Sequence, residues 1–137
     1  MPYFAPHSLQ LRELPPKRVR KEPRRRWFWS ARCDFIVWLS DDDAVLGFQF
    51  CYDKDGAERA LTWMPGCGFS HMRVDTGTWY GEAPMLVPDG PIDARRIHEL
   101  FVRDSGCLPP EYVDLFNEKL GGLAAGRQLR LDKVDKS

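Results

Sequence analysis

The sequence predicts an α+β fold. One domain begins with a curved antiparallel β-meander of five or six strands and ends with two α-helices packed on that sheet. Three apolar runs between Asp34 and Met64 are separated by two turn-forming segments, which is typical of consecutive hairpins. Apolar residues recur at helical spacing only after residue 90. The chain of 137 residues is long enough for one domain, and its 43% hydrophobic and 29% charged residues are ordinary for a soluble protein.

Residues 1–26 are predicted to form a basic arm, within which the weak alternation over residues 7–14 allows one edge strand. The arm holds eight Lys or Arg and two Glu, a balance of +6, so the rest of the neutral chain carries −6. Pro16 and Pro23 disfavour a continuous helix between them and favour an extended course. A basic arm on an acidic body indicates either a nucleic-acid contact or an arm folded on its own domain.

Two turns set the register of the predicted meander. If Asp41–Asp43 form the first loop, Ser40 faces Ala44. If the second loop is Asp53–Gly56, its last residue supplies the positive φ that closes a loop of this length. Side chains alternate across a strand, so both turns send one apolar set to the same face. The predicted strands cover residues 25–30, 34–40, 44–52 and 57–64, and the shared face holds Ile36, Trp38, Leu46, Phe48, Leu61 and Trp63.

The opposite face of this meander is also largely apolar. Such a sheet must be covered twice or must curl around one face. It also allows a homodimer in which the uncovered apolar faces of two copies meet.

The remaining elements follow from turn and helix signals. Pro65–Gly68 is a loop by composition, residues 69–74 alternate as a further strand, 78–80 continue it after a turn, and 84–88 are extended. One helix is expected to start at Asp89-Gly90-Pro91, where Asp89 is the cap candidate and Pro91 lies in the early turn, and to stop at Gly106. A second begins at Pro109-Pro110 and ends at Gly121-Gly122. The core domain is therefore predicted over 27–121, followed by a polar tail over 122–137.

Basic and aromatic residues adjoin each other between positions 17 and 29. In a strand, Trp27 and Trp29 point the same way, so they form an aromatic platform beside a positive patch, as in proteins that hold single-stranded nucleic acids. The alternative is internal, because arginines also stack on tryptophans within one protein. The nucleic-acid candidates are Lys17, Arg18, Arg20, Lys21, Arg24, Arg25, Arg26, Trp27 and Trp29.

Cys67, between two glycines, is the most nucleophile-like residue, and His71 follows four positions later. A thiol needs an adjacent base to become a nucleophile. Four residues of strand span about 13 Å, so the two side chains meet only if the loop over 65–68 folds back. The other reading is a glycine-rich connection that holds an inert thiol. The four cysteines are widely spaced and no secretory signal is expected, which favours free thiols in a reducing cytoplasm.

A further interpretation of the sequence is a ligand-binding cleft lined by aromatic side chains. Gln49 is the one polar residue of an apolar central run, and Trp79-Tyr80 lie between two glycines. Gln49 is then either an amide whose hydrogen bonds are made within the core, or part of a ligand-binding cleft with Trp79 and Tyr80. The sequence has no Cys-x-x-Cys and no paired histidines, so we expect neither a metal site nor a cofactor.

The phrases Gly47–Lys54, Ala60–Trp63 and Leu86–Gly90 resemble small bacterial proteins of unassigned function. The resemblance covers residues 27–120. It implies a compact single domain from the bacterial cytosol, and it brings no functional residues.

These observations favour a non-catalytic binding or regulatory module of unknown ligand in the cytoplasm, with no membrane partner. One alternative is a nucleic-acid-associated protein that uses residues 17–29. The other is a thiol-dependent enzyme centred on Cys67, with His71 as its base.

Overall fold

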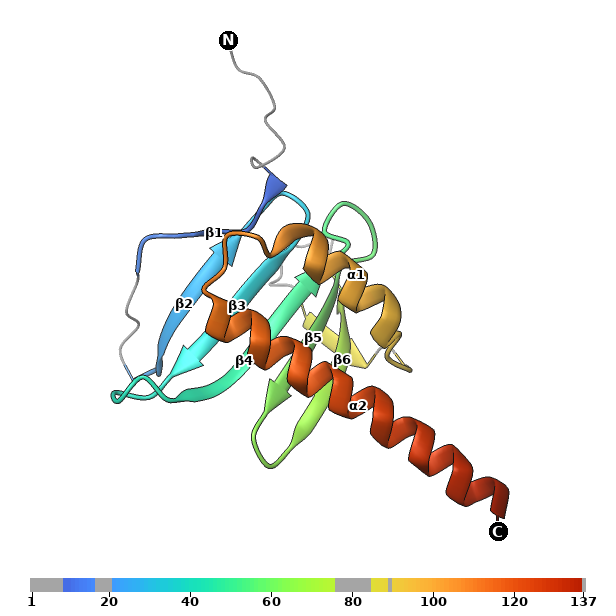
Figure 1. The fold of residues 1–137 in the computed structure, drawn as a ribbon. Coiled ribbons are helices and arrows are strands. Elements are labelled where there is room, and N and C mark those ends of the chain that lie inside the picture. Colours follow the sequence, from blue (N-terminus) through green and yellow to red (C-terminus); the bar gives the residue numbers. More distant parts are fainter. Residues whose placement is uncertain (1–8, 17–20, 76–84, 89, 137) are drawn as a thin grey trace.

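A computed structural model describes residues 9–16, 21–75, 85–88 and 90–136, with side chains omitted at 75, 85–88 and from 124 on. The described residues form one antiparallel sheet in which every strand pairs with its neighbour in sequence, followed by two helices (Figure 1). This confirms the predicted α+β meander. The strands are β1 (Arg12–Glu13), β2 (Arg24–Trp29), β3 (Asp34–Leu39), β4 (Val45–Tyr52), β5 (Arg59–Met64), β6 (Gly68–Asp75) and β7 (Met85–Pro88), and the helices are α1 (Ala94–Asp104) and α2 (Pro110–Lys136).

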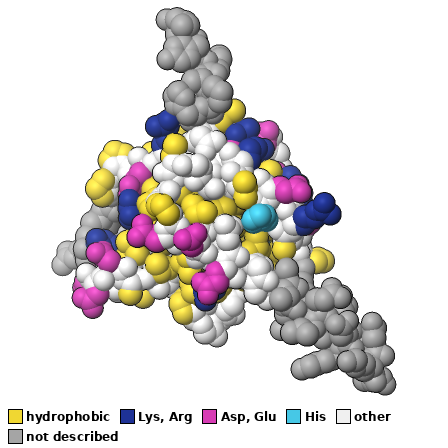
Figure 2. All heavy atoms as spheres, in the orientation of Figure 1, with side chains coloured by type: hydrophobic (Ala, Val, Ile, Leu, Met, Phe, Trp, Pro, Cys, Tyr) yellow, Lys and Arg dark blue, Asp and Glu magenta, His cyan; other side chains and the backbone are white. Residues whose placement is uncertain are grey.

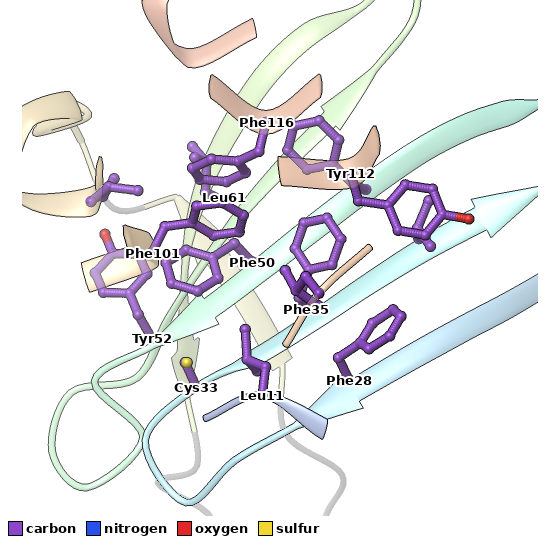
Figure 3. Close-up of a cluster of buried hydrophobic side chains, with 14 of the residues drawn as sticks. Leu11, Phe28, Cys33, Phe35, Phe50, Tyr52, Leu61, Phe101, Tyr112 and Phe116 are labelled. Atoms are coloured by element: carbon purple, nitrogen blue, oxygen red, sulfur yellow. The ribbon is translucent and has the colours of Figure 1, made fainter. Parts of the chain in front are cut away.

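Both helices lie across one face of the sheet, and the core fills the space between them (Figures 1 and 3). Phe101 of α1 and Phe116 of α2 stack with ring centroids 3.8 Å apart. Phe35 and Phe50 meet both rings from the sheet, with centroids 5.5–6.3 Å away. All four side chains are fully buried. Figure 2 views this helix-covered side, where hydrophobic side chains gather across the middle with charged ones around them.

The predicted shared face is wrong for β3. Val37, not Ile36, lies opposite Phe48, and Phe48 lies opposite Trp63. Ile36 and Trp38 therefore point away from the helices, so Trp38 and Trp63 lie on opposite sides of the sheet. The helix-covered face is made by Phe35, Val37, Leu39, Phe48, Phe50, Tyr52, Leu61 and Trp63.

A β-bulge in β4 causes the difference. The first loop closes as predicted, since the Ser40 N–H donates to the Ala44 carbonyl at 2.8 Å. Trp38 then lies opposite Gly47 instead of Leu46, and the register shifts by one residue. Leu46 is the extra residue and is 38% exposed. Both faces of the meander are apolar, so the alternating pattern fits either register, and the bulge decides between them.

The second hairpin has a longer loop than predicted. Tyr52 lies opposite Arg59, so the loop spans residues 53–58. The positive φ belongs to Asp53 (58°) and not to Gly56; aspartate tolerates this conformation in turns. The shift relative to the predicted pairing is two residues, which leaves every β5 side chain on its predicted face.

The first helix begins later than predicted, the second begins where predicted, and the second is longer than predicted. Asp93 caps α1 by accepting the Arg96 backbone N–H at 3.1 Å, in place of the predicted Asp89. The predicted end of α2 at Gly121-Gly122 is wrong, because the helix continues through both glycines to Lys136. Each glycine costs about 1 kcal/mol in a helix, and an established helix extends through such positions because only its first turn carries the nucleation cost.

The sheet face away from the helices is also well buried at its centre. Ile36 and Cys51 are 7% exposed there and Ala60 is fully buried. The predicted homodimer through this face stays a prediction. No helix among the described residues is long and apolar enough to cross a membrane.

Candidate functional site

Strand β2 divides the predicted basic and aromatic residues between the two faces of the sheet. Phe28 packs in the core against Phe35, so Arg24 and Arg26 share the helix-covered side. The opposite side carries Arg25, Trp27 and Trp29, which confirms that the two tryptophans face the same way. Lys21 is exposed in the turn before β2, whereas Lys17, Arg18 and Arg20 lie outside the described residues.

The arginines on the helix-covered side are held within the protein. Arg24 pairs with Asp43 and donates to the Ser40 carbonyl at 3.2 Å. Arg26 makes two hydrogen bonds to Glu13, at 2.7 and 2.8 Å, and lies 5.5 Å from the centre of the Tyr112 ring. The hydrogen bond from Arg26 holds the pKa of Glu13 below its ordinary value. These contacts fold this part of the arm onto its own domain.

On the other side, cations lie over indole rings. The Arg25 guanidinium is 5.1 Å from the centre of the Trp27 ring, and the Lys54 ammonium is 4.9 Å from that of Trp29. Trp29 is 46% exposed, and Arg12 of β1 lies directly opposite it in the sheet and is also exposed. We call Arg12, Arg25, Trp27, Trp29 and Lys54 the indole–cation surface.

Lys54 is fixed above Trp29 by two further contacts. Its ammonium donates to the Ser30 carbonyl at 2.8 Å and to Asp34 at 3.0 Å. Asp34 is only 8% exposed. Burial raises the pKa of this carboxyl, and the hydrogen bond from Lys54 partly opposes that shift. The ion pair therefore orients Lys54 and leaves its ammonium at the ring face.

A hollow of about 300 Å³ adjoins the same surface. Leu14, Pro15 and Pro16, which leave β1, form one wall, and Arg25 and Trp27 of β2 form the other. The volume lies at the lower end of the range for ligand pockets. Among the described residues neither Arg12 nor Arg25 has a carboxylate partner, so these two cations of the indole–cation surface are not neutralised within the described part of the chain.

Gln49 is a satisfied amide on the same sheet face. Its Nε2 donates to Thr62 Oγ1 at 2.9 Å, and the Cys51 thiol donates to its Oε1 at 3.5 Å. Burial raises the pKa of Cys51 to about 12, so this thiol stays protonated at neutral pH. Trp79 and Tyr80, the other residues of the predicted cleft, lie outside the described residues.

Cys67 and His71 are not brought together. Cys67 is exposed in the turn between β5 and β6, where its N–H donates to the Met64 carbonyl at 3.1 Å. His71 lies four residues along the extended strand β6, about 13 Å away by strand geometry, and its Nε2 is 2.5 Å from the Tyr52 hydroxyl. Within the described residues, no three or more His, Cys, Asp or Glu gather as they would around a metal ion.

Sequence reasoning missed Arg12 and Lys54. Arg12 lies within residues 7–14, whose weak alternation allows an edge strand, so the sequence does contain a signal that could place Arg12 in the sheet. The sequence predicts only a turn at Lys54, and the packing of the β4–β5 loop against the end of β2 brings its side chain over Trp29.

Comparison of the chain with protein-family models, curated proteins and solved structures found no match. The resemblance to small bacterial proteins therefore stays a prediction, and the functional argument rests on the geometry above.

Proposed function

We propose that this protein is a non-catalytic binding module and that the indole–cation surface holds single-stranded nucleic acid. The observation that carries the proposal is the pair of same-facing indoles with cations over them, on the sheet face that the two helices leave uncovered. Bases stack on aromatic rings whatever their sequence, and phosphates bind the adjoining cations.

The parts of the surface have different expected roles. The exposed ring of Trp29 offers the face on which a base stacks. Arg12 and Arg25 stand on either side of the indoles, where a strand that crosses β2 places its phosphates. The hollow beside Trp27 accepts a second base between Arg25 and the prolines.

Salt dependence follows from the number of cations. If Arg12 and Arg25, which have no described carboxylate partner, each neutralise one phosphate, the logarithm of the binding constant falls with the logarithm of salt concentration with a slope of about −1.4. A fourfold rise in salt then weakens binding roughly 7-fold.

The test is an anisotropy titration of a labelled oligothymidylate of about 12 nucleotides, at about 50 and 200 mM salt. Trp29→Ala should weaken binding between about 5-fold and 150-fold, because one stacked base is worth about 1–3 kcal/mol. Trp29→Phe should retain most of the affinity, since a ring remains. Arg25→Ala should reduce the salt slope by about 0.7.

Two exposed residues serve as matched controls. Arg95→Ala removes a guanidinium that is 90% exposed on α1, and Leu46→Ala removes an exposed apolar side chain at the bulge. Both should bind like the wild type. The proposal is wrong if the wild type shows no salt-dependent binding, or if Trp29→Ala and Arg25→Ala behave like these controls.

A further inference from the structure

A nearly buried carboxylate adjoins the exposed indole of the indole–cation surface. Asp34 of β3 lies directly opposite Trp29 of β2, and Arg12 of β1 lies opposite Trp29 on its other side. Residues that pair in this way share one face of the sheet, with Cβ atoms about 4.5–5.5 Å apart. The ring on which a base is proposed to stack therefore has a cation on one side and a carboxylate on the other.

Asp34 neutralises the cation above this ring. The Lys54 ammonium donates to the Asp34 carboxylate at 3.0 Å and lies 4.9 Å from the centre of the Trp29 ring. The side chains of the pair are 18% and 12% exposed, so solvent ions screen their attraction only partly. The hydrogen bond from Lys54 to the Ser30 carbonyl, at 2.8 Å, does not involve Asp34 and keeps the ammonium near the ring. The positive charge that Lys54 can offer to a phosphate therefore depends on the protonation state of Asp34.

Two further titratable groups adjoin this ion pair. Cys51 of β4 lies opposite Asp34 in the sheet, and burial raises the pKa of its thiol to about 12, so it is uncharged at neutral and acid pH. Glu58 lies just before β5, and burial, followed by the charge of Asp34, raises the pKa of its carboxyl. Burial also raises the pKa of Asp34. Both carboxyls therefore take up protons at a higher pH than an exposed carboxyl does, whose pKa is about 4.

We propose that protonation of Asp34 frees the positive charge of Lys54, so that the indole–cation surface binds single-stranded nucleic acid more tightly in acid than at neutral pH. This inference rests on the proposed function. While Asp34 is charged, Arg12 and Arg25 are the cations available to phosphates. Once Asp34 is protonated, Lys54 becomes a third such cation beside the stacked base, and a negative charge that repels phosphate is removed. Protonation of Glu58 acts in the same direction.

The salt dependence of binding distinguishes the two protonation states. Two available cations give a slope of about −1.4 in the plot of the logarithm of the binding constant against that of salt concentration, and three give about −2.1. A fourfold rise in salt weakens binding roughly 7-fold in the first state and roughly 20-fold in the second. At about 50 mM salt the third cation raises the binding constant roughly 8-fold.

The experiment is the anisotropy titration with oligothymidylate, repeated from about pH 7.5 to about pH 4.5 at both salt concentrations. Thymine does not titrate in this range, so a change in affinity belongs to the protein. The wild type should bind more tightly, and with the steeper slope, as the pH falls. Asp34→Asn should show the tight binding and the steep slope already at neutral pH, which tests the inference without acid. Lys54→Met should keep the shallow slope at every pH.

Two controls accompany these variants. Asp42→Asn removes an exposed carboxylate from the β3–β4 loop and should keep the pH dependence of the wild type. Urea denaturation at neutral pH checks the fold of Asp34→Asn. Because the folded protein favours the protonated form of Asp34, removal of this charge should not lower the free energy of unfolding.

Failure of this inference and failure of the proposed function give different results. If the wild type shows no salt-dependent binding at any pH, both are wrong. If it binds at neutral pH, but its affinity and slope stay constant as the pH falls, the function stands and the role of Asp34 is refuted. A pH dependence that persists in Asp34→Asn also refutes that role, because it would come from other groups, such as His98 of α1.

Discussion

Asp104, at the end of α1, joins three parts of the fold and offers a sharp test of the packing. Its carboxylate is fully buried and accepts hydrogen bonds from Arg32, from Arg103 at 3.0 Å through two nitrogens, and from the Cys33 thiol at 3.3 Å. Its backbone carbonyl accepts the Leu11 N–H at 2.9 Å. The residue therefore ties the segment before β1 and the β2–β3 turn to the helix.

The substitution Asp104→Asn keeps the volume and removes the charge. Removing one charged partner of a buried ion pair lowers the free energy of unfolding by about 3–5 kcal/mol. The side chains of Arg32 and Arg103 are 32% and 41% exposed, so water partly rehydrates them and the cost falls to the lower end, about 3 kcal/mol. For a chain of this length that loss corresponds to a decrease in Tm of roughly 10 °C.

Urea denaturation followed by circular dichroism measures the difference directly. The matched control is Asp114→Asn, at an exposed position on α2, which should change the free energy of unfolding by less than about 0.5 kcal/mol. A loss below about 1 kcal/mol for Asp104→Asn would show that these hydrogen bonds do not hold the three segments together.

Three further predictions concern the bulge and the thiols. Gly47→Ala should lower the free energy of unfolding, measured by urea denaturation, by about 1–3 kcal/mol, because a Cβ there would lie 2.8 Å from a backbone oxygen of β5. An unchanged midpoint of urea denaturation would contradict the register. Burial raises the pKa of Cys33 and of Cys51 to about 12. In the unfolded chain these thiols lose their protons above about pH 8.5, so the free energy of unfolding should decrease as the pH rises beyond that value. The expected slope is about 1.4 kcal/mol per pH unit for each thiol. Cys51→Ala should remove one thiol's share of that slope, and an unchanged slope would refute the assignment. In native protein iodoacetamide should label Cys67 well before Cys33 or Cys51, and equal rates in mass spectrometry would argue against the burial described above.

The fold could be predicted from the sequence because its signals are local. Turn residues at 41–43 and 53–56, proline and glycine punctuation, and strands before helices all act within short stretches of chain. The register could not be predicted, since both sheet faces are apolar and the choice depends on the bulge at Leu46, next to Gly47, whose hydrogen atom faces the backbone of β5. A pattern of alternation contains no information on such a contact.

The same distinction applies to the candidate site. Alternation along β2 was enough to predict that Trp27 and Trp29 share a face. The neutralisation of Arg24 by Asp43 and the placement of Lys54 over Trp29 depend on residues that are distant in sequence. Sequence reasoning therefore found the aromatic half of the surface and only part of its charge.

The most direct test of the proposed function is ¹⁹F NMR of protein labelled with 5-fluorotryptophan, titrated with single-stranded oligothymidylate. Trp29 and Trp27 should shift on titration and return toward their free positions as salt is raised. Trp63, which packs on Phe48 beneath the helices, should not move. Shifts at Trp63 with none at Trp29 would contradict the account, as would a spectrum that the oligonucleotide leaves unchanged.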